Sequence, residues 1–250
     1  MRKKVIAGNW KMNKDLNESQ NLVSGIIDGL GNENKCDVVV CPPFTSLNEV
    51  HSLIKNTPIK LGAQNVYYET DGAFTGEVST GMLKSVGCDY VIIGHSERRT
   101  IFGEKDELLN KKNKKALADG LKVIFCIGES LAQREKGITN SVVEKQLQKG
   151  LDGISSEELN NIIIAYEPVW AIGTGKTATP EQAQEVHAFI RNYISQKYSK
   201  ESGEGLIIQY GGSVKPDNAA SLLSQPDIDG ALIGGACLKV DSFLSIIAAA

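Results

Sequence analysis

The sequence predicts an α/β protein with one domain, a (β/α)₈ barrel spanning residues 1–250. Short β-branched runs alternate with longer amphipathic stretches along the whole chain, and no linker or low-complexity segment interrupts them. A length of 250 residues also suits one such barrel. The competing topology is a doubly wound open sheet, which has the same alternation of strands and helices.

Eight apolar runs have the composition of parallel strands that are buried on both faces. In chain order they are Lys4 to Ala7, Asp37 to Cys41, Ile59 to Gln64, Tyr90 to Ile93, Lys122 to Cys126, Ile162 to Tyr166, Leu206 to Tyr210 and Gly230 to Ile233. Helical stretches follow them, for example Asn17 to Leu30, Asp106 to Ala118 and Pro180 to Lys197. The last of these starts at a threonine cap, Thr179, followed by proline at the first helical position.

The composition is that of an ordinary soluble protein, with 41% hydrophobic and 23% charged residues. A formal net charge of -3 gives no reason to expect a nucleic-acid or membrane partner. The N-terminus lacks the apolar core of a signal peptide, so we predict a cytoplasmic protein. The five cysteines form no Cys-x-x-Cys pair, and neither a disulfide framework nor a zinc site is expected.

Polar residues follow several predicted strands, at the barrel face where catalytic groups gather. They are Asn9 and Lys11 after the first strand, Gln64 and Asn65 after the third, His95, Ser96 and Glu97 after the fourth, Glu129 after the fifth and Glu167 after the sixth. The last two strands are followed by Gly211-Gly212-Ser213 and Gly234-Gly235, where backbone N–H groups often bind phosphate.

Glu167 is the preferred general base, because it leaves a buried strand directly before a loop that can close. Pro168 keeps the chain extended after the strand, and the next helix begins only at Pro180. Val169 and Trp170 can exclude water when the loop closes, which would raise the basicity of the carboxylate. Glu97 and Glu129 are the alternative candidates for the base. Each of them could instead serve in an ion pair.

His95 precedes the charged run 96–99, so its ring is expected near the N-terminus of a short helix. The partial positive charge there disfavours protonation, and a neutral histidine can donate a hydrogen bond to a substrate oxygen. The competing interpretation is a histidine held by capping contacts. His51 and His187 lie in amphipathic stretches and are predicted to be surface residues.

Two further segments carry alternatives. Gly173-Thr174-Gly175-Lys176-Thr177 ends like a P-loop, but Trp170 stands where that motif needs its first glycine, so a nucleoside triphosphatase is disfavoured.

The connection from Asn65 to Ser79 is long for a βα loop and rich in large side chains. We expect it to pack against a second copy in a homodimer, with a self-packed Ω-loop as the alternative.

Several stretches together make the chain similar to the triosephosphate isomerase family over essentially its full length. They are Gly8-Asn9-Trp10-Lys11-Met12-Asn13, Gly72-Ala73-Phe74-Thr75-Gly76-Glu77, Ile93-Gly94-His95-Ser96-Glu97-Arg98-Arg99, the segment from Ala165 to Lys176, and Tyr210-Gly211-Gly212-Ser213-Val214. The resemblance implies a TIM barrel that interconverts dihydroxyacetone phosphate and D-glyceraldehyde 3-phosphate through an enediolate, without metal or organic cofactor.

The resemblance also implies a role for each site residue. Glu167 is the base, His95 polarises the carbonyl, and Lys11 with Asn9 stabilises the oxyanion. The residues implied to bind phosphate are Asn9, Lys11, Gly173, Ser213, Gly234 and Gly235. The implied lid spans Pro168 to Ala178 and includes Pro168, Val169, Trp170, Lys176, Thr177 and Ala178. Thr75 is implied to reach the partner's site across the dimer interface.

One departure from the family pattern is Cys237, where serine is common, and it raises the question of thiol sensitivity. Two rivals remain at this point. One is another phosphate-binding barrel isomerase that acts on a larger sugar phosphate, and the other is a barrel that only binds.

Overall fold

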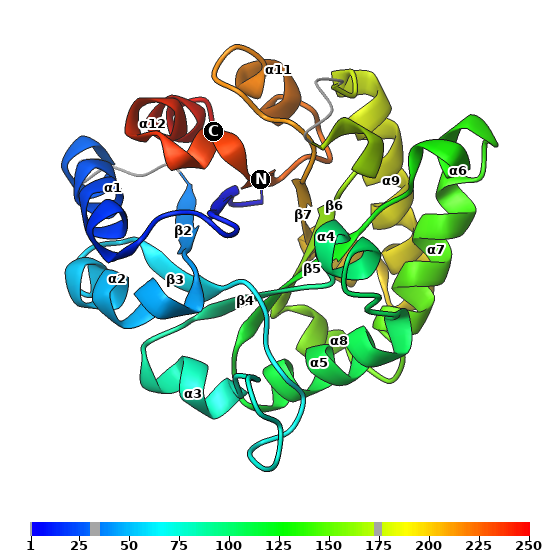
Figure 1. The fold of residues 1–250 in the computed structure, drawn as a ribbon. Coiled ribbons are helices and arrows are strands. Elements are labelled where there is room, and N and C mark those ends of the chain that lie inside the picture. Colours follow the sequence, from blue (N-terminus) through cyan, green and yellow to red (C-terminus); the bar gives the residue numbers. More distant parts are fainter. Residues whose placement is uncertain (1, 31–35, 173–176) are drawn as a thin grey trace.

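Eight parallel strands close into a barrel in which β8 pairs back with β1 (Figure 1). The computed structural model describes residues 2–30, 36–172 and 177–250. The strands are β1 (Val5–Asn9), β2 (Asp37–Cys41), β3 (Lys60–Ala63), β4 (Tyr90–Ile93), β5 (Lys122–Ile127), β6 (Ile162–Tyr166), β7 (Ile207–Tyr210) and β8 (Gly230–Ile233). The closed order confirms the predicted TIM barrel and excludes the open sheet.

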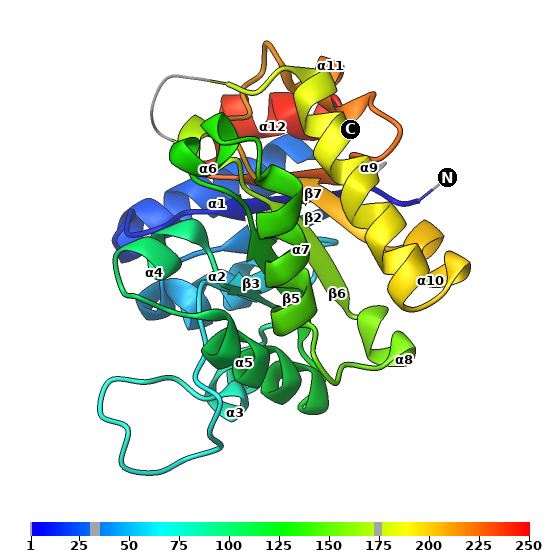
Figure 2. The ribbon, with the colours of Figure 1, turned by 90° about the vertical axis from the view of Figure 1, so that its right-hand side faces the viewer.

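Helices surround the barrel and connect successive strands (Figures 1 and 2). The α-helices are α1 (Leu16–Leu30), α2 (Leu47–Ile54), α3 (Thr80–Ser85), α4 (Ser96–Thr100), α5 (Asp106–Ala118), α6 (Leu131–Glu135), α7 (Thr139–Gly150), α8 (Ser156–Leu159), α9 (Pro180–Lys197), α10 (Lys200–Gly205), α11 (Ala219–Leu223) and α12 (Val240–Ala248). The 3₁₀ turns are η1 (Phe44–Ser46), η2 (Val169–Ala171) and η3 (Gly235–Leu238). Among the described residues, the structure has no helix with the length and hydropathy of a bilayer span.

The predicted strands are confirmed, with shifts of one or two residues at some ends. The largest shift is in β1, which begins one residue later than predicted and ends two residues later, at Asn9. The predicted cap of α9 is also confirmed. The Thr179 hydroxyl accepts the N–H of Gln182 at 3.2 Å, and the Gln182 side chain accepts the N–H of Thr179 at 3.0 Å.

Side chains along most strands alternate between two hydrophobic cores. On β6, Ile163 and Ala165 belong to the small core inside the barrel, whereas Ile164 and Tyr166 pack in the larger core under the helices. This period of two persists although every residue of the strand is apolar. The next inward position along the chain is Glu167, so the pleat of β6 directs this carboxylate toward the barrel axis.

Burial corrects the expectation for His187 and answers the question of thiol sensitivity at Cys237. His187 was predicted at the surface, but it is fully buried on the inner face of α9, where its ring lies edge-on to Tyr166 at 5.8 Å. The amphipathic pattern of α9 does not reveal this, because histidine is compatible with either face of such a helix. Cys237 is also fully buried, and burial raises the pKa of its thiol to about 12, so it is unreactive in the folded protein.

The connection between β3 and α3 extends away from the barrel as a long loop (Figure 2). Val66 at its base is buried, but residues 69–77 are all exposed. The Tyr67 ring lies 4.8 Å from that of Phe74, so part of the loop packs on itself. The exposed run offers surface to a second chain, as the dimer hypothesis requires.

Candidate active site

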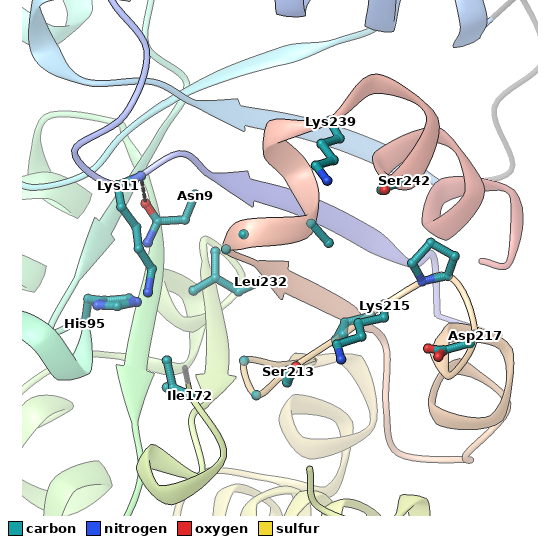
Figure 3. A pocket seen from close by; sticks show the side chains of 17 residues that line it. Asn9, Lys11, His95, Ile172, Ser213, Lys215, Asp217, Leu232, Lys239 and Ser242 are labelled. Carbon is teal, nitrogen blue, oxygen red and sulfur yellow. Dashed lines mark hydrogen bonds between the residues drawn. The ribbon is translucent and has the colours of Figure 1, made fainter. Parts of the chain in front are cut away.

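A cavity of about 600 Å³ opens at the C-terminal ends of the strands (Figure 3). Six of the predicted site residues line it together: Asn9, Lys11, His95, Ser213, Gly234 and Gly235. Glu167 does not line the cavity, since its side chain is buried beside His95 in the wall. The structure therefore brings the predicted catalytic groups together at one end of the barrel.

The Glu167 carboxylate is held by three donors from the β4–α4 segment. The Ser96 N–H donates to Oε2 at 2.8 Å, the Ser96 hydroxyl donates to Oε1 at 3.2 Å, and His95 Nε2 lies 3.0 Å from Oε1. The backbone is anchored by the Glu167 N–H, which donates to Ile127 O at 2.7 Å. Close approach of β5 requires glycine at 128, because a Cβ there would lie 1.7 Å from Glu167 O.

His95 occupies the N-cap position of α4. Gly94 precedes it with φ of 77°, a conformation that glycine adopts without strain, and this turn breaks the alternation of β4. Nδ1 of His95 accepts the N–H of Glu97 at 3.3 Å, so Nε2 carries the ring proton and donates to Glu167. A neutral ring with its N–H at Nε2 satisfies both contacts.

The two neighbours shift each other's titration. Burial lowers the pKa of His95, but the charge of Glu167 and its hydrogen bond outweigh burial and place that pKa above its ordinary value. The expectation that the N-terminus of α4 disfavours protonation of His95 is therefore wrong while Glu167 lies beside the ring. For Glu167, burial raises the pKa, yet His95 and Ser96 outweigh it and hold the pKa below the ordinary value. The rise in basicity expected for Glu167 is therefore wrong for this arrangement, in which three donors compensate desolvation.

Lys11 has a backbone conformation that lysine rarely adopts, with φ of 54°. Its backbone is secured on both sides, because its N–H donates to Asn9 Oδ1 at 3.1 Å and its carbonyl accepts from Gln64 Nε2 at 2.9 Å. Its ammonium lies 2.5 Å from Glu97 Oε1. Strain maintained by surrounding contacts is common at functional sites. Here it directs the Lys11 side chain toward His95 (Figure 3).

The wall of the cavity includes the loops after β7 and β8, with Ser213, Gly234 and Gly235. The Ser213 carbonyl accepts from Asn218 Nδ2 at 3.1 Å, which ties its loop to the start of α11. An added Cβ at Gly234 would lie 3.2 Å from Lys11 Cε, so this backbone passes close to the lysine. The backbone of these two loops therefore borders a part of the cavity that an anion can enter.

The alternative carboxylates have other partners. Glu97 is partly exposed and pairs with Lys11. Glu129 is fully buried and accepts hydrogen bonds from the Tyr166 hydroxyl at 3.0 and 3.1 Å and from Trp170 Nε1 at 2.8 Å. It therefore anchors the start of the loop after β6 and does not face the cavity.

The predicted lid is described only in part. Pro168 leads into η2, which contains Val169 and Trp170, while Thr177 is exposed and Ala178 is buried. Gly173 and Lys176 lie outside the described residues. Thr75 is exposed in the loop after β3 and does not line this cavity.

Two contacts that position the site are not predictable from the sequence. Ser96 holds Glu167, and Gln64 holds both Lys11 and Cys41 through their carbonyl oxygens, each at 2.9 Å. Both residues were noted at strand ends, which was the available signal, but their partners are distant in sequence. Within the described part of the chain, no three His, Cys, Asp or Glu side chains gather in a way that would hold a metal ion.

A family model described as triosephosphate isomerase matches residues 4–250. The chain belongs to this family. It is 55% identical to the triosephosphate isomerase of Chloroherpeton thalassium, over all of both chains. It is 56% identical to that of Carboxydothermus hydrogenoformans, over 99% of this chain and 98% of the relative. The relative from Roseiflexus castenholzii is 54% identical, over 99% and 97%. The chain is thus an isomerase, and the comparisons support neither rival function.

Proposed function

We propose that this isomerase interconverts dihydroxyacetone phosphate and D-glyceraldehyde 3-phosphate through an enediolate. The observation that carries the proposal is a buried carboxylate, Glu167, 3.0 Å from Nε2 of a histidine that lines the cavity. Glycine-bearing loops, with Gly211, Gly212, Gly234 and Gly235, line the same cavity. The cavity thus has a base, Glu167, and a proton donor, His95, at one end, and loops suited to bind phosphate beside them. This combination suits a small phosphorylated carbonyl compound.

Glu167 takes the proton from the carbon next to the carbonyl group and returns it to the neighbouring carbon. To do so, its carboxylate exchanges the hydrogen bonds of Ser96 for the substrate C–H. The lowered pKa ensures that the carboxylate is ionised before this exchange. Leaving the Ser96 donors removes two interactions that lower that pKa, so the base becomes stronger at the substrate.

The enediolate oxygen is stabilised by groups that already face the cavity. The Nε2–H of His95 donates to it and moves protons between the two substrate oxygens, while the Lys11 ammonium supplies positive charge and Asn9 a further donor. Because Nδ1 of His95 accepts the Glu97 N–H, the ring stays neutral when Glu167 moves away.

The substrate phosphate binds to backbone N–H groups at Ser213, Gly234 and Gly235, with Lys11 nearby. Gly173, outside the described residues, is a further proposed donor. The segment from Pro168 to Ala178 serves as a lid that protects the enediolate from water and from loss of phosphate. Its first residues pack on Glu129 through Trp170 in the described arrangement.

We also propose that residues 1–250 form one domain and that two copies form a homodimer in the cytoplasm, without nucleic-acid or membrane partners. Thr75 in the exposed loop would reach the partner's site. Large apolar side chains exposed on the connections after β1 to β4 support this assembly. They are Met12, Phe44, Phe74, Met82, Ile101 and Phe102.

A coupled assay of the purified protein with D-glyceraldehyde 3-phosphate tests the function. Glu167→Gln should lower kcat on the order of 10³-fold, because it removes the base but keeps the shape of the side chain. Binding of 2-phosphoglycolate should survive in this variant. Glu135→Gln, an exposed carboxylate of α6, is the matched control and should keep its activity.

No turnover by the wild-type protein would reject the function. Retained turnover by Glu167→Gln would instead assign the base to Glu97 or Glu129.

A further inference from the structure

The cavity continues well beyond the groups assigned to the triose phosphate. From His95 and Lys11 it passes Ser213 and ends among Lys215, Asp217, Lys239 and Ser242 (Figure 3). Gly234 also lines it. Cavities of 300–1,000 Å³ hold ligands of drug size. A volume of about 600 Å³ is therefore more than a triose phosphate, with about ten non-hydrogen atoms, needs.

Two lysines line the outer part of the cavity. Figure 3 places Lys215 and Lys239 on the side of Ser213 that is away from His95, with Lys239 above and Lys215 below in that view. Neither takes part in any of the ion pairs found between described residues. The lysines that do are Lys3, Lys11, Lys112, Lys115, Lys149 and Lys200. The ammonium groups of Lys215 and Lys239 are therefore available to an anion.

Both lysines belong to the connections after β7 and β8, which also contain Ser213, Gly234 and Gly235. The Lys215 N–H donates to Asn218 Oδ1 at 2.8 Å, and the Asn218 amide in turn binds the Ser213 carbonyl. Lys239 directly precedes α12, and Ser242 in the first turn of that helix also lines the cavity. The positive end of a nine-residue helix thus adds to the two ammonium groups.

We propose that Lys215, Lys239 and Ser242 form a second anion subsite, so that the cavity binds a diphosphate group. The inner phosphoryl group occupies the site at Ser213, Gly234 and Gly235, and the outer one contacts the two lysines. The inference rests on the proposed phosphate site and extends it. Such a ligand competes with the triose phosphate, because both need the inner site.

Asp217 is the one carboxylate among the residues lining the cavity, and it opposes an anion. Figure 3 shows its carboxylate at the outer edge of the cavity, on the side of Asp217 that is nearer to Lys215 in that view. The outer part therefore has one negative charge against two positive charges. Removing that charge by Asp217→Asn should strengthen diphosphate binding about twofold to threefold.

Competition by inorganic pyrophosphate and by orthophosphate, at constant ionic strength, tests the subsite. We expect both to be competitive with substrate, with an inhibition constant at least about tenfold lower for pyrophosphate. In the double variant Lys215→Gln/Lys239→Gln, this ratio should fall to about twofold. A wild-type ratio near one, or a ratio that the double variant retains, would overturn the proposal.

A matched control separates the effect of losing these two lysines from the effect of changing the net charge of the protein. Lys55 is exposed at the end of α2, remote from the cavity, and Lys55→Gln/Lys60→Gln removes the same charge as the double variant. This control should keep the wild-type ratio. An equal fall of the ratio in both double variants would show general electrostatics and reject the subsite.

Calorimetry without substrate keeps this test independent of the proposed isomerisation. Pyrophosphate should bind the wild-type protein more tightly than orthophosphate, and the lysine double variant should lose this preference. ADP distinguishes the source of the ligand, since a nucleoside diphosphate should match pyrophosphate only if the cavity admits an ester on the outer phosphoryl group. Absence of pyrophosphate binding would overturn the subsite even if turnover is normal.

Discussion

Glu167 shows how one side chain can be both buried and ionised. Burial alone would favour the protonated carboxyl group, but the N–H and hydroxyl of Ser96 and the ring of His95 donate to it. Together they hold its pKa below the ordinary value despite burial. The carboxylate is thus ionised although it is buried. In the proposed reaction, each donor that it leaves on approach to substrate increases its basicity.

Lys11 lines the cavity and carries a positive charge that an anionic ligand can contact. Lys11→Ala should weaken 2-phosphoglycolate binding by about 2 kcal/mol, roughly 30-fold, because a charge-assisted contact is lost. Lys14→Ala is the control, since Lys14 also has a positive φ, 75°, but does not line the cavity. Calorimetry on both variants measures the difference. Unchanged affinity in Lys11→Ala would remove Lys11 from the site.

Helix α9 connects the end of the predicted lid to the barrel wall. Its capped start at Thr179 sets where the loop after β6 ends, and its inner face buries His187 against Tyr166 of β6. His187 Nδ1 lies 3.1 Å from Asp227 O. Burial lowers the pKa of His187 to about 3, so the ring is neutral in the folded protein.

This burial predicts a pH dependence of stability. In the unfolded chain the histidine titrates near 6.5, so between pH 6.5 and pH 3 the unfolded state binds the additional proton. The free energy of unfolding therefore falls as pH falls through this window. At pH 5 the loss from His187 is about 2 kcal/mol relative to pH 7.

Urea denaturation at fixed protein concentration measures this effect. Between pH 7 and pH 5, the free energy of unfolding of the wild type should fall by about 2 kcal/mol more than that of His187→Gln, because glutamine does not titrate. His187→Gln is expected to be less stable than wild type at pH 7, but only the difference between the two pH values tests the burial. Equal losses in both proteins would contradict it.

At the scale of the whole molecule, the connections after the first four strands leave large apolar side chains exposed. Met12 is 96% exposed and Ile101 71% exposed, whereas the strands beneath them are almost entirely buried. Exposed apolar groups of this size on neighbouring loops are typical of protein interfaces. The extended loop after β3 adds a surface that the barrel itself does not cover (Figure 2).

Sedimentation at micromolar concentration should give the mass of a dimer. Met12→Asp should shift the protein toward monomer, because it places a charge in the proposed interface. Leu131→Asp, at an exposed apolar position of α6, is the control and should remain dimeric. A monomer mass for wild type would contradict the assembly, and a dimeric Met12→Asp would exclude Met12 from the interface.

Local patterns predicted the elements because their causes act over a few residues. The apolar run of β6, the Thr179–Pro180 start of α9 and the helix after His95 depend on side-chain period, capping and proline geometry. The burial of His187 was not predictable in this way. A histidine in an amphipathic helix has the same local pattern whether its ring faces solvent or the barrel wall.

Residue patterns and motifs were enough to predict the eight strands, the chemical groups at their ends and the family of the chain. Which of these groups meet depended on the folded barrel. Glu167 and Ser96 are 71 residues apart, and they hydrogen-bond because closure of the barrel brings the ends of β4 and β6 to one face. Sterics and capping are local, but contacts across a barrel depend on the pairing of every strand between them.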